Sequence, residues 1–149
     1  MNTEVKKKSM TQKQKELLLN DLCARLPYKV YAQIPDEYGG YTSAIESIDI
    51  DGFVKDSEGT QIEIENIKPY LFPLSSMSDE QWMDTPYANL NNFTFDSFKC
   101  GCSTLAFETY EVNLNYVVEF INWCYKNHFD INGLIPMGLA IDATGKNIY

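Results

Sequence analysis

Two prolines in the middle of the chain are the feature that most limits what the sequence can fold into. Pro69 and Pro73 have no backbone N–H and a fixed φ, so we expect neither a helix nor a central strand to run through residues 67–78. The residues between them, 70–72, are aromatic or aliphatic and too apolar for a free loop. The stretch therefore predicts an ordered crossover, packed on the core, that joins a small β half to a helical half.

The length and the apolar content predict a folded domain of ordinary size. A chain of 149 residues can bury a hydrophobic core without disulfides or metal. No apolar run reaches the roughly 20 residues that span a bilayer, and the polar residues 1–10 lack the apolar segment of a signal peptide. We expect a flexible N-terminal arm at residues 1–10, a single domain at residues 11–149, a cytoplasmic location, no membrane partner and reduced cysteines.

The acidic residues are unevenly distributed along the chain. Residues 1–29 contain seven Lys and Arg against three Asp and Glu, whereas residues 30–149 contain five against eighteen. A body this acidic repels phosphate backbones, so direct binding of nucleic acid is not expected. The oligomeric state does not follow from these charges.

Three helices are predicted from capping and periodicity. Thr11 and Gln14 fit a capping box, which predicts a helix over Gln12–Arg25, with Cys23 buried on its apolar stripe. A second capping box at Ser78 predicts one or two helical turns. The apolar stripe of Leu114–Lys126, in which Val118 is included, predicts the third helix.

Three antiparallel strands are expected before the crossover. They fall at 28–34, somewhere within 41–54, and at 60–67, with a turn at 56–59 between the last two. The predicted fold class is therefore α+β, with a small antiparallel sheet of about three strands packed against an N-terminal helix and C-terminal helices.

The alternation of isoleucines in the last two strands fixes which side chains should face the core. Strand side chains point alternately to opposite faces, so even-numbered residues of both strands should share the buried face. These residues are Ile48, Ile50, Val54, Ile62 and Ile64.

The same parity predicts an acidic ridge on the other face, formed by Asp49, Asp51, Glu63 and Glu65. The simplest interpretation of this acidic ridge is a hydrated surface. It would also suit docking of a basic protein surface, or a hard divalent cation, although no ligand-spacing motif accompanies it.

Cysteine and histidine side chains offer one further possible site. Cys100, Cys102, Cys124 and His128 have the ligand types of a tetrahedral zinc site, but their spacing is unlike that of zinc knuckles. A cysteine paired with His128, the sole histidine, could act as a nucleophile and base. The alternative for His128 is a role in ending the preceding helix. We assign no catalytic, cofactor-binding or metal-binding residue, and no cofactor.

Three stretches carry a resemblance to known proteins. They are Lys15-Glu-Leu-Leu-Leu-Asn-Asp-Leu-Cys-Ala-Arg-Leu-Pro27, Ile67-Lys-Pro-Tyr-Leu-Phe-Pro-Leu-Ser-Ser-Met77, and Asn127-His-Phe-Asp-Ile-Asn-Gly-Leu-Ile135 with Gly138-Leu-Ala140. Together they resemble a group of small uncharacterised proteins of Bacteroides and related gut bacteria that is associated with prophages and mobile elements. The resemblance implies a genomic setting and no activity.

The acidic ridge and the ten tyrosines favour a non-enzymatic protein that binds another protein through an acidic, tyrosine-rich surface. The resemblance implies that it is an accessory protein of a mobile element. Two alternatives stay open. One is an anti-defence inhibitor or nucleic-acid mimic, whose carboxylates would be spaced like phosphates. The other is a small enzyme that depends on cysteine and histidine.

Overall fold

The computed structural model describes residues 9–86, 88 and 114–149. The chain divides into two compact units, Met1–Pro69 and Tyr70–Tyr149. The boundary between them falls within the proline-containing stretch 67–78. Most of the predicted N-terminal arm lies outside the described residues, as do Cys100 and Cys102.

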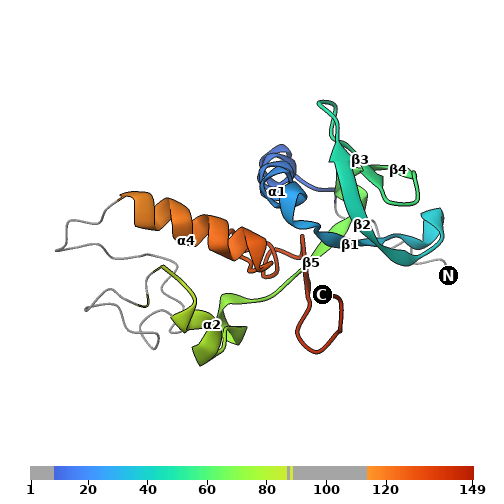
Figure 1. Cartoon of the computed structure of the whole chain (residues 1–149). Coiled ribbons are helices and arrows are strands. Elements are labelled where there is room, and N and C mark those ends of the chain that lie inside the picture. Colours follow the sequence, from blue (N-terminus) through green and yellow to red (C-terminus); the bar gives the residue numbers. More distant parts are fainter. Residues whose placement is uncertain (1–8, 87, 89–113) are drawn as a thin grey trace. The chain divides into compact units, whose positions relative to one another are not determined.

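The described strands form one mixed sheet, so the fold is α+β with six strands rather than the expected three (Figure 1). The first four strands make an antiparallel meander, and the order across the sheet is β4-β3-β2-β1-β5-β6. The strands are β1 Tyr31–Ile34, β2 Tyr41–Ile48, β3 Phe53–Asp56, β4 Gln61–Glu63, β5 Lys68–Leu71 and β6 Ile141–Asp142. The range in which one strand was expected, 41–54, therefore holds β2 and the start of β3, separated by a turn.

Strand β5 covers Lys68–Leu71, so a strand includes Pro69, although not Pro73, in the stretch from which the prolines were expected to exclude one. Its first two residues, Lys68 and Pro69, pair antiparallel with β1, whereas Tyr70 and Leu71 pair parallel with β6. Pro69 therefore has a paired strand on one side only, and its missing N–H interrupts no second ladder. The prediction was wrong because the two ends of this strand use different partners.

Helix α1, Gln12–Arg25, has the predicted bounds and the predicted capping box. The Thr11 hydroxyl accepts a hydrogen bond from the Gln14 N–H at 3.2 Å, and the Gln14 side chain accepts one from the Thr11 N–H at 2.9 Å. Leu18 and Leu22 are fully buried. Cys23, which was expected to be buried, is exposed.

The buried face of α1 also carries an ion pair. The guanidinium of Arg25 donates two hydrogen bonds to the carboxylate of Asp21, at 2.6 and 3.0 Å, and neither side chain has exposed surface. This pair replaces Cys23 on the inner face, because residues 21 and 25 lie one helical turn apart and beside Leu18 and Leu22. Within the described residues, four short 3₁₀ helices complete the connections: η1 Leu26–Tyr28, η2 Asp36–Tyr38, η3 Ile64–Asn66 and η4 Leu74–Ser76.

In the described part of the second unit, helices α2 and α4 lie side by side and contribute to one core cluster (Figure 1). Helix α2, Asp79–Met83, begins at the predicted capping box of Ser78 and Gln81, and helix α4 spans Leu114–Lys126. Val118, expected in the core stripe of α4, is 55% exposed. The core cluster of this unit consists of Met77, Trp82, Phe120, Cys124 and Phe129.

Candidate functional site

The turn between β2 and β3 is an exposed feature of the first unit with several backbone hydrogen bonds. Residues 50–52 form a three-residue loop, closed by a hydrogen bond from the Asp49 N–H to the Phe53 carbonyl at 2.9 Å. One oxygen of the Asp49 carboxylate accepts hydrogen bonds from the N–H groups of Asp51 and Phe53, at 3.0 and 2.9 Å. Gly52 has a φ of 82°, which a glycine adopts without steric cost. The tip of this hairpin is therefore fixed by its own backbone and by Asp49.

The hairpin turn overturns part of the parity prediction. Val54 and Ile62 pair with each other and are fully buried, as the alternation requires. Ile64 is also buried, at 6% exposed, but it lies in η3, because the strand expected at 60–67 ends at Glu63. Ile50, however, is 97% exposed at the tip of the hairpin. Ile48 is half-buried. Strand alternation does not extend through a turn, so it gave the wrong environment for Ile50.

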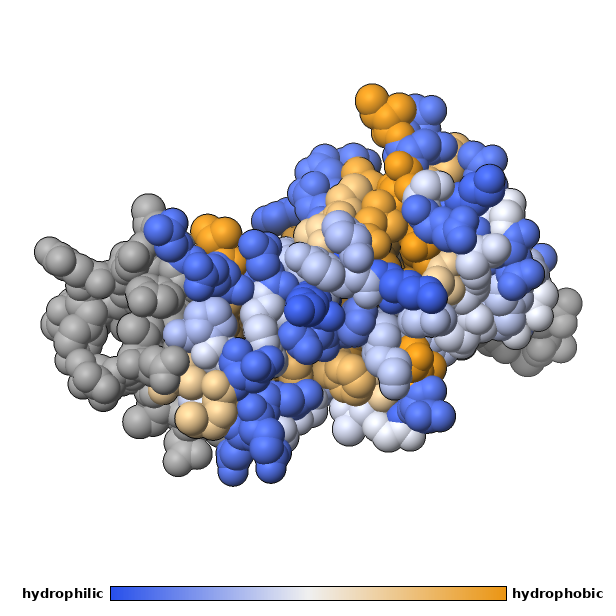
Figure 2. Space-filling model, in the orientation of Figure 1, coloured by the Kyte–Doolittle hydropathy of each residue, from blue (hydrophilic) through white to orange (hydrophobic). Residues whose placement is uncertain are grey.

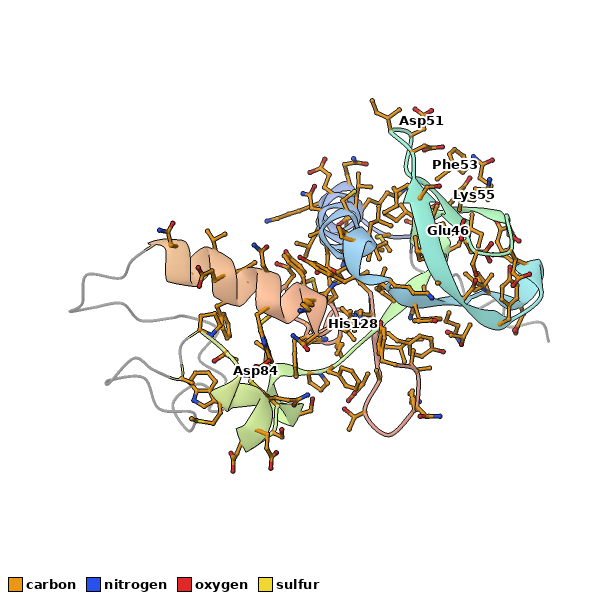
Figure 3. All side chains as sticks on the ribbon, viewed as in Figure 1. Glu46, Asp51, Phe53, Lys55, Asp84 and His128 are labelled. Carbon is orange, nitrogen blue, oxygen red and sulfur yellow. The ribbon has the colours of Figure 1, made fainter. Side chains whose placement is uncertain are left out.

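Three members of the predicted acidic ridge come together in one open pocket. Asp51 from the turn, Glu63 from β4 and Glu65 from η3 line it, with a cavity volume of about 340 Å³. The other lining residues are Lys15 of α1, Gly52, Phe53 and Ile64. We call this the acidic pocket. Figure 3 shows Asp51 near the hairpin tip, with Phe53 just below it.

Asp49 does not line the acidic pocket. Its carboxylate is instead used by the turn, because one of its oxygens accepts the N–H groups of Asp51 and Phe53. The four acids of the ridge therefore divide into one structural residue and three residues that surround a common space.

The charges around the acidic pocket are unbalanced. Lys15 forms an ion pair with Glu65, with 2.5 Å between Nζ and the carboxylate oxygen. Lys15 is the only cation among the residues that line the pocket, and its ion pair is with Glu65 rather than with Asp51 or Glu63. Residues 46–65 as a whole contain seven Asp and Glu and a single Lys, Lys55. The pocket therefore offers a negative potential beside the apolar groups of Phe53 and Ile64.

One acid of this segment is buried and serves the fold. Asp56, with no exposed surface, accepts hydrogen bonds from the N–H groups of Glu58 and Thr60 and, at 2.6 Å, from the Tyr41 hydroxyl. The hydrogen bond to Asp56 raises the pKa of the Tyr41 hydroxyl above its ordinary value. Asp56 thus fixes the β3–β4 turn, which carries the chain to Glu63.

The described tyrosines do not line the acidic pocket. Tyr31 lines a second open pocket, of about 590 Å³, over β1 and β2. Lys29 stands there with Glu46 and Glu58, and the Ser57 hydroxyl on its rim lies 2.7 Å from that of Ser43. The lining of this second pocket has two acids and one lysine, so its excess of negative charge is smaller than that of the acidic pocket, which has three acids and one lysine.

The cysteine and histidine candidates have structural surroundings. Cys124 is fully buried in the core cluster of the second unit. His128, at a φ of 63°, ends α4: its N–H bonds the Tyr125 carbonyl at 3.2 Å, and the Phe129 N–H bonds the Cys124 carbonyl at 2.9 Å. This hydrogen-bond pattern is a Schellman motif, so the interpretation of His128 as a helix-ending residue is confirmed, through its backbone. Its imidazole stacks on the ring of Tyr149, with 3.7 Å between ring centroids.

The suggested zinc ligands fall partly within and partly outside the described residues. Cys100 and Cys102, two of the four suggested zinc ligands, lie outside the described residues. Among residues 9–86, 88 and 114–149, no three His, Cys, Asp or Glu side chains are grouped to hold a metal ion. The described part of the chain likewise contains no helix long and apolar enough to cross a bilayer.

Comparisons with known proteins found no match. No family model, curated protein or solved structure matches the chain. The resemblance to proteins of mobile elements stays a prediction.

Two features of the site could have been found in the sequence but were missed. Asp51-Gly52, flanked by apolar residues, is a strong hairpin signal, and it would have divided the range 41–54 into two strands. The ion pair between Lys15 of α1 and Glu65 of η3 could not be predicted from a local pattern, because these two elements are far apart in the sequence.

Proposed function

We propose that this protein works by binding and not by catalysis, and that it docks a basic surface of a partner protein onto the acidic pocket. The observation that carries the proposal is the convergence of Asp51, Glu63 and Glu65 on one open pocket in which Lys15 is the only cation. The genomic setting implied by the resemblance would make it an accessory protein of a mobile element.

The lining of the acidic pocket suits a lysine or arginine side chain of the partner. The ring of Phe53 and the aliphatic Ile64 can pack against the methylene groups of such a side chain, while its charge meets Asp51 and Glu63. The excess of acids in residues 46–65 adds long-range attraction, which raises the rate of encounter with a basic protein.

The expected strength of these ion pairs sets a limit on what they contribute. Exposed pairs are worth about 0.2–1 kcal/mol each, because water and salt screen them. Two new pairs at Asp51 and Glu63 would therefore strengthen binding by roughly tenfold at low salt, and by less as the salt concentration rises. Such a site contributes more to the orientation and selection of a basic partner than to the affinity for it.

The test uses two variants that change the net charge equally. Asp51→Asn with Glu63→Gln removes two charges from the acidic pocket, and Glu80→Gln with Glu119→Gln removes two exposed charges from α2 and α4. The probe is an octalysine peptide, and its affinity for each full-length variant is measured at several salt concentrations.

We expect the pocket variant to bind octalysine at least about fivefold more weakly than the unmodified protein, and the control variant to change by less than about twofold. Equal losses in both variants would mean that octalysine responds to diffuse charge, and would refute the acidic pocket as the docking site. Circular dichroism spectra of both variants establish that they are folded.

A further inference from the structure

Ile50 is the most exposed large apolar side chain of the described residues, at 97%. It stands at the tip of the β2–β3 hairpin, where an apolar group projects from the surface at the top of Figure 2. Turn positions of this kind usually hold Asn, Asp, Gly or Ser, and the geometry of the turn places no demand for an apolar residue there. The side chain therefore contributes nothing to the core of the free protein.

The turn holds Ile50 in a defined position. The backbone on both sides is tied down: the Asp49 N–H bonds the Phe53 carbonyl at 2.9 Å, and the Gly52 N–H bonds the Asp49 carbonyl at 3.1 Å. The Gly52 carbonyl also accepts the N–H of Ile64 at 3.0 Å, which joins the tip to the chain beyond β4. Binding of a partner at Ile50 would therefore cost this protein little conformational entropy, because the loop is already ordered.

We propose that Ile50 is an apolar anchor that inserts into a hollow of a partner protein, and that lysine or arginine residues border that hollow. This inference rests on the proposed function, which it deepens by naming the group that would hold the partner. An anchor of this kind supplies what exposed ion pairs do not, because affinity at interfaces is concentrated in a few fully desolvated side chains.

The partner's basic border follows from charge complementarity. Asp49 and Asp51 flank Ile50 in the sequence, and Asp51 also lines the acidic pocket together with Glu63. Any surface that closes over Ile50 must face these carboxylates, and a basic surface does so favourably. Phe53, 36% exposed at the end of the same turn, extends the apolar contact toward the pocket.

Charge also weighs against the two other occupants of the tip. A second copy of the chain would bring the same net charge of -9, which repels the acidic tip even though residues 1–29 are basic. An anionic membrane would repel the same carboxylates. A basic protein surface is the partner that the tip fits.

A peptide selection followed by affinity measurements tests the anchor. A random dodecapeptide library is selected against the full-length protein, and the enriched peptides are then titrated into variants. Ile50→Ser tests the anchor, Met83→Ser removes an apolar side chain 66% exposed on α2 as a matched control, and Asp51→Asn with Glu63→Gln tests the acidic pocket. Because Ile50 makes no core contact, its replacement by serine leaves the fold intact, and a circular dichroism spectrum establishes this.

We expect enriched peptides to combine aliphatic or aromatic residues with lysine or arginine. Ile50→Ser should weaken their binding at least about tenfold, and Met83→Ser by less than about twofold. If Ile50→Ser has no effect while the charge variant weakens binding, the anchor is wrong and the proposed function stands. If neither variant matters, or no peptide is enriched, both are wrong. A dimer of the unmodified protein that Ile50→Ser dissociates would assign the tip to self-association and overturn the anchor.

Discussion

Replacing Asp49 tests whether this residue belongs to the turn or to the charged surface. Asp49→Ala removes the oxygen that accepts the N–H groups of Asp51 and Phe53. A hydrogen bond between protein groups contributes about 0.5–1.5 kcal/mol net, but here both bonds share one oxygen and both N–H groups can turn to water. The loss should therefore be about 1 kcal/mol, which resembles the cost of removing a helix N-cap.

Amide hydrogen exchange measures this loss at the turn itself. A local free-energy change of about 1 kcal/mol corresponds to roughly fivefold faster exchange of the Asp51 and Phe53 amides. Asp49→Asn is the matched control, because it removes the charge and keeps the accepting oxygen. It should change the exchange rates by less than about twofold. If Asn and Ala accelerate exchange equally, the charge of Asp49 matters rather than its acceptor, and the division of the ridge into one structural and three pocket residues is wrong.

Three further substitutions probe the surrounding structure. Arg25→Met should cost about 3–5 kcal/mol in the free energy of unfolding, because it removes the guanidinium that donates two hydrogen bonds to the buried Asp21 carboxylate. The double variant with Asp21→Leu should recover most of the loss in urea titrations. The raised pKa of Tyr41 means that its contribution is fully present below about pH 10 and is lost as the pH rises through the folded pKa. The difference in thermal midpoint between the unmodified protein and Tyr41→Phe should accordingly shrink in alkaline solution, and a constant difference would contradict the hydrogen bond to Asp56. Asp130→Ala removes a buried carboxylate that accepts hydrogen bonds from two backbone N–H groups, and should lower the free energy of unfolding by about 2–3 kcal/mol. Unfolding is followed by the fluorescence of the two tryptophans of the same unit. An unchanged unfolding midpoint would show that water replaces the carboxylate.

Local signals in the sequence predicted the helices well. Thr11 with Gln14 and Ser78 with Gln81 fixed two helix starts, because each capping box involves residues only three positions apart. The sheet was harder to predict. The pairing of β5 with both β1 and β6 depends on residues distant in the sequence, and it allows Pro69 into a strand that a local rule excluded.

The candidate site was predicted in part for the same reason. Period-two alternation placed Val54 and Ile62 correctly, and therefore Glu63 on the opposite face. It failed at Ile50, since a turn interrupts the alternation between β2 and β3. Ile50 was expected in the core but is the most exposed large apolar residue of the hairpin, and this exposure is the basis of the anchor proposal.

The most direct test of the account is the mapping of amide chemical-shift changes on the full-length, isotope-labelled protein during titration with an enriched peptide. We predict that the largest changes fall at residues 49–53 and 63–65, around the hairpin tip and the acidic pocket, and that Ile50→Ser makes them much smaller at the same peptide concentration. Changes centred instead on the basic N-terminal residues or on the helices of the second unit would contradict the account.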